Sequence, residues 1–118
     1  MIKVSVLYKN QDGCRFDMDY YCKDHVPMLR DKLGSACKGI AVDQGMAGEE
    51  PGSAAPFVAM IHLFFDTVED FQNSFGPEAD IILADVPNYT NAEMLVQISE
   101  VRINATRGET GDLHLHRV

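Results

Sequence analysis

The sequence lacks several features that mark common classes of protein. Its ten lysines and arginines form no cluster, and against eighteen aspartates and glutamates they leave a net charge of −8. Nucleic acids select basic surfaces, so this balance argues against a nucleic-acid partner. No apolar run approaches the roughly 20 residues that a membrane-spanning helix needs, so no membrane partner is expected either.

Recognisable processing, redox and catalytic signatures are also missing. Residues 1–10 lack the long apolar core and cleavage site of a signal peptide. The three cysteines, Cys14, Cys22 and Cys37, are odd in number and have no CxxC spacing, which favours free thiols in a reducing compartment. We therefore expect a cytoplasmic protein. There is no Gly-rich phosphate loop, GxSxG motif or paired-carboxylate signature, and no cofactor is expected.

What the sequence does contain is the pattern of one α+β domain. Its 118 residues suffice for a single core. Alternating or continuously apolar runs predict strands at residues 2–8, 38–45, 57–65 and 93–101. Amphipathic spacing predicts helices at residues 17–33 and 66–85. Residues 46–56 are a long loop, either a wide hairpin connection or a lid.

The order of these elements predicts a ferredoxin-like βαββαβ fold, an antiparallel sheet with two helices on one face. Residues 57–65 are apolar on both sides, so a central strand buried on both faces is expected. Helices on one face would leave the other face apolar and uncovered. We therefore expect a homodimer in which two sheets face each other. The domain is assigned to residues 1–103.

The polar tail, residues 104–118, is expected to be loose or draped over the domain. His114 and His116 lie on one side of it, with Asp112 nearby. A metal ion needs three or four well-placed ligands, so no metal site is expected.

The first predicted helix places a histidine on its apolar face. At helical spacing this face consists of Met18, Cys22, His25, Leu29 and Leu33. An N-cap at residue 17 and a glycine stop at residue 34 bound the helix. A proline at residue 27 is expected to kink the helix, or to break and restart it, beside the imidazole.

The sequence contains a series of short blocks at defined spacing: Gly13–Tyr21, His25–Pro27, Lys38–Gly39, Gly45, Pro51–Gly52, Ala55–Pro56, His62–Asp66, Phe71–Gln72, Phe75–Pro77, Ala84–Thr90 and Gln97–Glu100. Through these blocks the sequence resembles the EthD family, named for a protein associated with ethyl tert-butyl ether degradation. The similarity runs from residue 1 to about residue 102.

The resemblance implies a dimeric α+β barrel with a pocket in each subunit between sheet and helices. Relatives in that superfamily include lactone isomerases, polyketide-tailoring enzymes, monooxygenases and haem proteins, whereas the EthD family has no settled chemistry. The usual His-Met-Pro-Leu block is His-Val-Pro-Met here, starting at His25. None of the three cysteines belongs to the family pattern, and nothing besides His25 would favour haem.

His25 is the candidate catalytic residue, as a general acid or base in an apolar pocket. The alternative is a core histidine bonded to a backbone carbonyl that the proline has freed. Candidate ligand contacts are Tyr8, Tyr21, Leu29, His62 and Tyr89. For His62, a structural position facing the partner sheet is favoured over one in the pocket. In the segment Asp85–Thr90, turn formation is favoured over a role in binding.

Two functions fit these features. The first is a cofactor-independent enzyme in which His25 moves a proton on a small hydrophobic organic molecule, as an isomerase or lyase does. The second is a non-catalytic accessory or ligand-binding protein of an oxygenase or degradation system. An open cavity beside His25 with a second polar group would favour the first.

Overall fold

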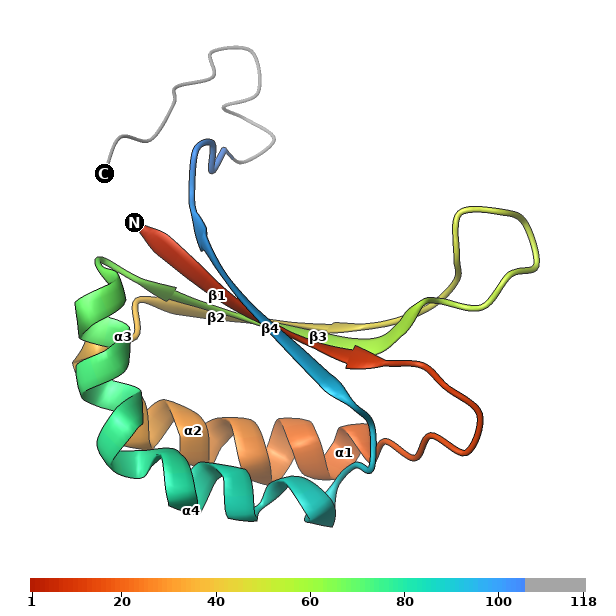
Figure 1. Ribbon diagram of the computed structural model, residues 1–118, viewed down its shortest axis with the longest axis horizontal. Helices are drawn as coiled ribbons and strands as arrows, with labels where there is room; N and C mark the ends of the chain where they lie inside the picture. The colour runs from red at the N-terminus through yellow and green to blue at the C-terminus, as the bar shows by residue number, and fades with distance from the viewer. Residues whose placement is uncertain (106–118) are drawn as a thin grey trace.

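One antiparallel sheet carries helices on one of its faces (Figure 1). The computed structural model describes residues 1–105. The strands β1 (Ile2–Lys9), β2 (Gly39–Gln44), β3 (Phe57–Phe65) and β4 (Met94–Glu100) lie in the order β2-β3-β1-β4, and all neighbours are antiparallel. This is the predicted α+β, ferredoxin-like arrangement. Each predicted strand end is met to within one residue.

The two faces of the sheet differ in burial. On β3, Ala59, Ile61, Leu63 and Phe65 are at most 3% exposed and pack under the helices. The alternate residues on the opposite face, such as Met60, are only half-buried. The sequence predicts that β3 is buried on both faces. In the single chain only the face under the helices is fully buried.

The first helical segment comprises α1 (Met18–Tyr20), a π turn (Tyr21–His25) and α2 (Val26–Leu33). The backbone N–H of Val26 bonds the carbonyl of Tyr21, five residues back, which defines the wider π turn. Pro27 sits in the first turn of α2, where its missing N–H costs little. The expected kink or break is therefore replaced by a wide turn in a helix that continues through it (Figure 1).

This wide turn corrects the predicted apolar stripe. Cys22 is exposed and Met18 is only half-buried, whereas Tyr21 is fully buried. The inward residues are therefore Tyr21, His25, Leu29 and Leu33, each four apart. In a regular α-helix of 3.6 residues per turn such a stripe drifts around the axis. The π turn holds more residues per turn, and so keeps the first two on the side of the sheet.

The second helical segment consists of α3 (Val68–Phe75) and α4 (Ala79–Ala84), joined by the 3₁₀ turn Gly76–Glu78. A further 3₁₀ turn, Val86–Asn88, follows α4. Thr67 caps α3 by accepting a hydrogen bond from the backbone N–H of Asp70.

No helix within residues 1–105 has the length and apolarity to cross a bilayer.

The loop between β2 and β3 projects past the end of the sheet (Figure 1). It is closed by a backbone hydrogen bond from Gly48 to Ser53 and contributes no residue to the cavity described below. The loop is therefore better described as a wide hairpin connection than as a lid. The histidines considered as metal ligands, His114 and His116, lie outside the described residues.

Candidate functional site

A cavity of about 250 Å³ lies between the sheet and the helices. It is smaller than the ~300–1,000 Å³ pockets that take drug-sized ligands, so it suits a smaller molecule. Two of its lining residues, Leu83 and Val96, are 51% and 62% exposed, so it opens to solvent between α4 and β4. Its inner walls are apolar and include Val4, Ile61, Leu63, Phe71, Phe75 and Ile82.

His25 brings a polar group to this apolar wall. Its side chain is almost fully buried, and Nδ1 lies 2.8 Å from Oδ2 of Asp85. A carboxylate at Nδ1 favours the tautomer protonated there, which leaves a lone pair on Nε2. Nε2 has no hydrogen-bond partner among residues 1–105. Every fully buried side-chain nitrogen or oxygen in these residues does have a partner, so Nε2 is not fully buried. Nε2 is therefore accessible from the cavity that His25 lines.

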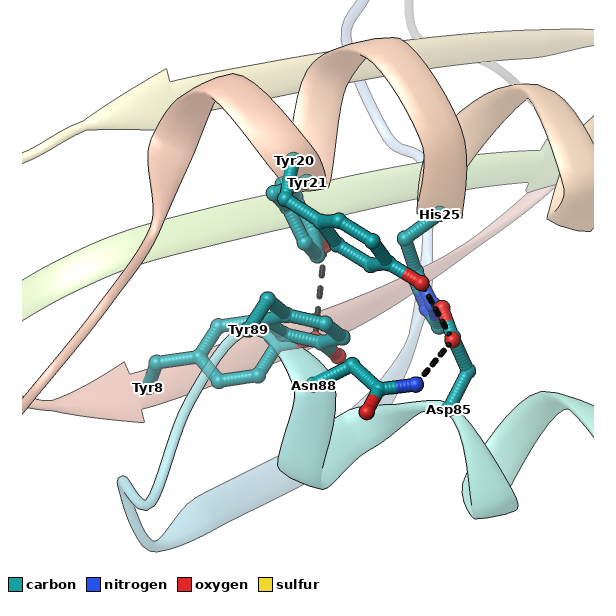
Figure 2. A network of polar contacts seen from close by, with 7 residues as sticks. All are labelled: Tyr8, Tyr20, Tyr21, His25, Asp85, Asn88 and Tyr89. Carbon is teal, nitrogen blue, oxygen red and sulfur yellow. Dashed lines mark hydrogen bonds and ion pairs between the residues drawn. The ribbon is translucent and has the colours of Figure 1, made fainter.

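Asp85 is the C-cap of α4 and is held from three sides (Figure 2). The hydroxyl of Tyr20 donates to Oδ1 at 2.6 Å, and the amide of Asn88 donates to the same oxygen at 2.9 Å. Burial would raise the pKa of Asp85, but hydrogen bonds from Tyr20, Asn88 and His25 outweigh it and keep the pKa below its ordinary value. Asp85 is therefore a carboxylate at neutral pH, oriented toward His25.

The replacement Asp85→Asn is expected to lower the free energy of unfolding by about 1–3 kcal/mol at neutral pH, because one amide oxygen cannot satisfy three donors. A depressed folded-state pKa contributes stability above the unfolded value, near 3.9, and loses it as pH falls through the folded value. The gap between the two proteins should therefore begin to narrow below about pH 4 and close as pH falls through the lower, folded value. Urea unfolding from pH 7 to pH 3 measures this difference in stability. The exposed Asp80→Asn is the control, and a gap that does not narrow between pH 4 and pH 3 would contradict the expectation.

Three hydroxyls of cavity-lining tyrosines are hydrogen-bonded to one another. Tyr8 Oη lies 2.9 Å from Tyr89 Oη and 3.3 Å from Tyr21 Oη (Figure 2). All three side chains are at most 3% exposed. Burial raises the pKa of each phenol above its ordinary value. The cluster therefore stays protonated at neutral pH and supplies hydrogen-bond donors rather than a base.

The aromatic rings of this cluster also hold the imidazole. The His25 ring stacks on Tyr21 at a centroid distance of 5.4 Å and an interplanar angle of 16°. It contacts Tyr89 at 4.5 Å. Phe16 packs edge-on against Tyr21 at 5.0 Å, from the position before the N-cap. These contacts fix the orientation of the imidazole beside the phenols.

The structure brings together four of the five candidate ligand contacts. Tyr8, Tyr21, Leu29 and Tyr89 line the cavity with His25. His62 does not, because it lies on the opposite face of β3. There its Nδ1 is 2.7 Å from Ser5 Oγ and its Nε2 is 3.2 Å from an Asp43 carboxylate oxygen. This geometry agrees with the structural position favoured for His62 and disagrees with its prediction as a ligand contact.

Sequence reasoning missed the partner of the histidine. A bond from the imidazole to a backbone carbonyl was the structural alternative, but the imidazole bonds the carboxylate of Asp85, sixty residues along the chain. Asp85 was interpreted as a turn residue, which it also is, since its backbone carbonyl accepts from Asn88 N–H. The only available signal was its place in the Ala84–Thr90 block of the family resemblance.

Among residues 1–105, no three or more histidine, cysteine, aspartate or glutamate side chains are grouped to hold a metal ion. The cysteines Cys14, Cys22 and Cys37 are free thiols, and none lines the cavity. The polar groups available to a ligand are therefore the imidazole of His25 and the tyrosine hydroxyls.

Comparison with known proteins places these features in a family. No curated protein matches the chain. An EthD-like protein from Ralstonia eutropha is similar to it, with 41% identity, a TM-score of 0.86, and coverage of 89% of this chain and 95% of that one. An EthD family protein from Bacillus halodurans shares 17% identity over 85% and 97% of the chains, with a TM-score of 0.59.

A protein of unknown function from Bacteroides fragilis, described as dimeric with a ferredoxin-like fold, shares 19% identity over 84% and 94% of the chains, with a TM-score of 0.55. The family model of the EthD domain matches residues 15–93, which include both His25 and Asp85. The resemblance inferred from the sequence is thus confirmed, and the chain belongs to the EthD family.

Proposed function

We propose that the protein binds a small hydrophobic organic molecule in the cavity and that His25 acts on it as a general base without a cofactor. The observation that carries this proposal is the pairing at the imidazole: Nδ1 is bonded to Asp85, and Nε2 faces the apolar cavity. A positioned base that can reach a bound molecule typically contributes ~10²–10⁴-fold to a proton transfer. The reaction class is a proton transfer of the isomerase or lyase type.

Each neighbour of His25 has a role in such a step. Asp85 holds the reactive tautomer and stabilises the imidazolium that forms when Nε2 takes a proton. Tyr20 and Asn88 orient this carboxylate and are positioning residues. Asp85 also borders an open surface hollow with Tyr20 and Asn88, so protons can exchange between the pair and solvent on the side away from the cavity.

The test is hydrogen–deuterium exchange at an activated carbon. The ketone 2-tetralone is a small bicyclic molecule whose benzylic C–H next to the carbonyl exchanges slowly in D₂O. We expect the protein to accelerate this exchange above the buffer rate, as measured by proton NMR. Binding without acceleration would contradict the general-base proposal.

That second outcome is the result expected of the alternative function, a non-catalytic ligand-binding or accessory protein of an oxygenase or degradation system. The observation that favours it is the small number of polar groups on an otherwise apolar wall. Measuring binding and exchange on the same sample separates the two functions.

We also propose that the protein is a homodimer whose sheets face each other in an α+β barrel. The support is the half-buried apolar surface on the sheet face away from the helices, to which β3 contributes Val58, Met60 and Phe64. The fold neighbour described as dimeric is consistent with it.

A further inference from the structure

The tyrosine cluster has one more O–H donor than it has hydrogen bonds. Each phenol carries one proton, so the hydroxyls of Tyr8, Tyr21 and Tyr89 offer three donors. They form two hydrogen bonds among themselves, both through Tyr8. Whichever directions these bonds take, one O–H is left over. Among residues 1–105, none of the three hydroxyls forms a further hydrogen bond.

All three tyrosines line the cavity and are buried from bulk solvent, so an acceptor for the surplus donor can reach it only through the cavity. A buried donor without an acceptor is unfavourable, so an acceptor that enters the cavity gains a hydrogen bond there. The nearby imidazole Nε2 has the opposite character, since in the tautomer that Asp85 favours it is an acceptor. The cavity thus offers a ligand one donor and one base.

We infer that the substrate class is a small, mostly apolar carbonyl compound, whose oxygen accepts the surplus tyrosine O–H and whose adjacent C–H faces His25. This inference rests on the proposed function and names its substrate class. A ketone or lactone oxygen satisfies the donor, and the apolar remainder fills the aliphatic and aromatic walls. Carboxylates and phosphates fit less well, because no cationic lysine or arginine side chain lines the cavity formed by residues 1–105.

The chemistry balances without another reactant. Nε2 of His25 takes the proton from the carbon next to the carbonyl. The C–H electron pair forms a C=C bond, and the carbonyl π pair moves to the oxygen, where the tyrosine O–H donates. Return of the proton from Nε2 to a carbon of the same conjugated system regenerates the carbonyl and completes an isomerisation.

A matched pair of ligands tests the proposed hydrogen bond from a tyrosine O–H to the carbonyl oxygen. Tetralin has the ring system of 2-tetralone without the oxygen, so the ratio of their dissociation constants isolates the carbonyl. In the variant Tyr8→Phe/Tyr21→Phe/Tyr89→Phe all three hydroxyls are removed together, which leaves no unsatisfied partner and keeps the ring shapes. We expect the preference for the ketone over tetralin to fall at least about tenfold from the wild type to this variant, measured by NMR titration.

An unchanged ratio would overturn the inference. If the triple variant does not fold, the carbonyl ¹³C resonance of labelled 2-tetralone bound to the wild type decides. A shift to higher frequency than in hexane supports the hydrogen bond, and the hexane value refutes it. The variant His25→Asn separates this inference from the proposed function, because it should lose the exchange activity and keep the preference for the ketone. Accelerated exchange without a preference for the ketone over tetralin would overturn the proposed hydrogen bond from the tyrosines and leave the general-base proposal standing.

Discussion

Replacing His25 with asparagine is expected to reduce protein-dependent deuterium exchange of 2-tetralone by about 10²–10⁴-fold. The asparagine Nδ2 occupies nearly the position of the histidine Nδ1, so it can still donate to Asp85. What it lacks is any atom at the position of Nε2, the group that faces the cavity. The variant therefore removes the base and keeps the partner of Asp85 satisfied.

The matched control is His62→Asn, which makes the same substitution on the opposite face of β3. His62 contacts Ser5 and Asp43 there and lines no part of the cavity. Exchange should be unaffected by it. Binding of 2-tetralone should stay within a few-fold of the wild-type affinity in both variants, so that lost exchange reports lost chemistry. Full exchange activity in His25→Asn, with normal binding, would show that this imidazole is not the base.

The second large effect concerns assembly. Met60→Lys places a charge at the centre of the sheet face proposed to meet its copy. Met60 pairs with Asp43 of β2, which offers the new ammonium group a partner in the single chain. Burying that charge in a dimer interface costs several kcal/mol, so we expect the dimer dissociation constant to rise by about 100-fold or more.

Sedimentation velocity over a range of micromolar concentrations measures this change. Ile81→Lys is the control, because it adds the same charge to α4 at a side chain that is 55% exposed. That variant should sediment like the wild type. A wild-type protein that is monomeric in this range would refute the dimer, and a Met60→Lys dimer of normal affinity would refute the interface on this face.

Local patterns were enough to predict the fold. The alternation of residues 2–8 and the apolar run 57–65 each identify a strand without knowledge of its neighbours. Their order then leaves few topologies. The inward position of His25 was predicted for the same reason, since it depends on spacing within one helix.

The remaining features depend on contacts between distant segments. The hydrogen bond from His25 to Asp85 joins two helices, and the tyrosine cluster joins β1, the π turn and the segment before β4. The burial of Tyr21 in place of Cys22 depends on a wide turn that α-helical spacing does not predict. The volume beside the imidazole depends on how large side chains pack, which composition does not determine.

The π turn Tyr21–His25 also limits how this helix can change in length. Loss of one residue from the π turn itself would restore α-helical hydrogen bonding and leave both flanks near their present orientation, because this wide turn holds about one residue more than an α turn does. Loss of one residue from α2, where the hydrogen bonding is already α-helical, would instead rotate the preceding part of the helix by about 100° relative to the part that follows. Tyr21 would then leave the cavity, and Tyr20 would lose its bond to Asp85.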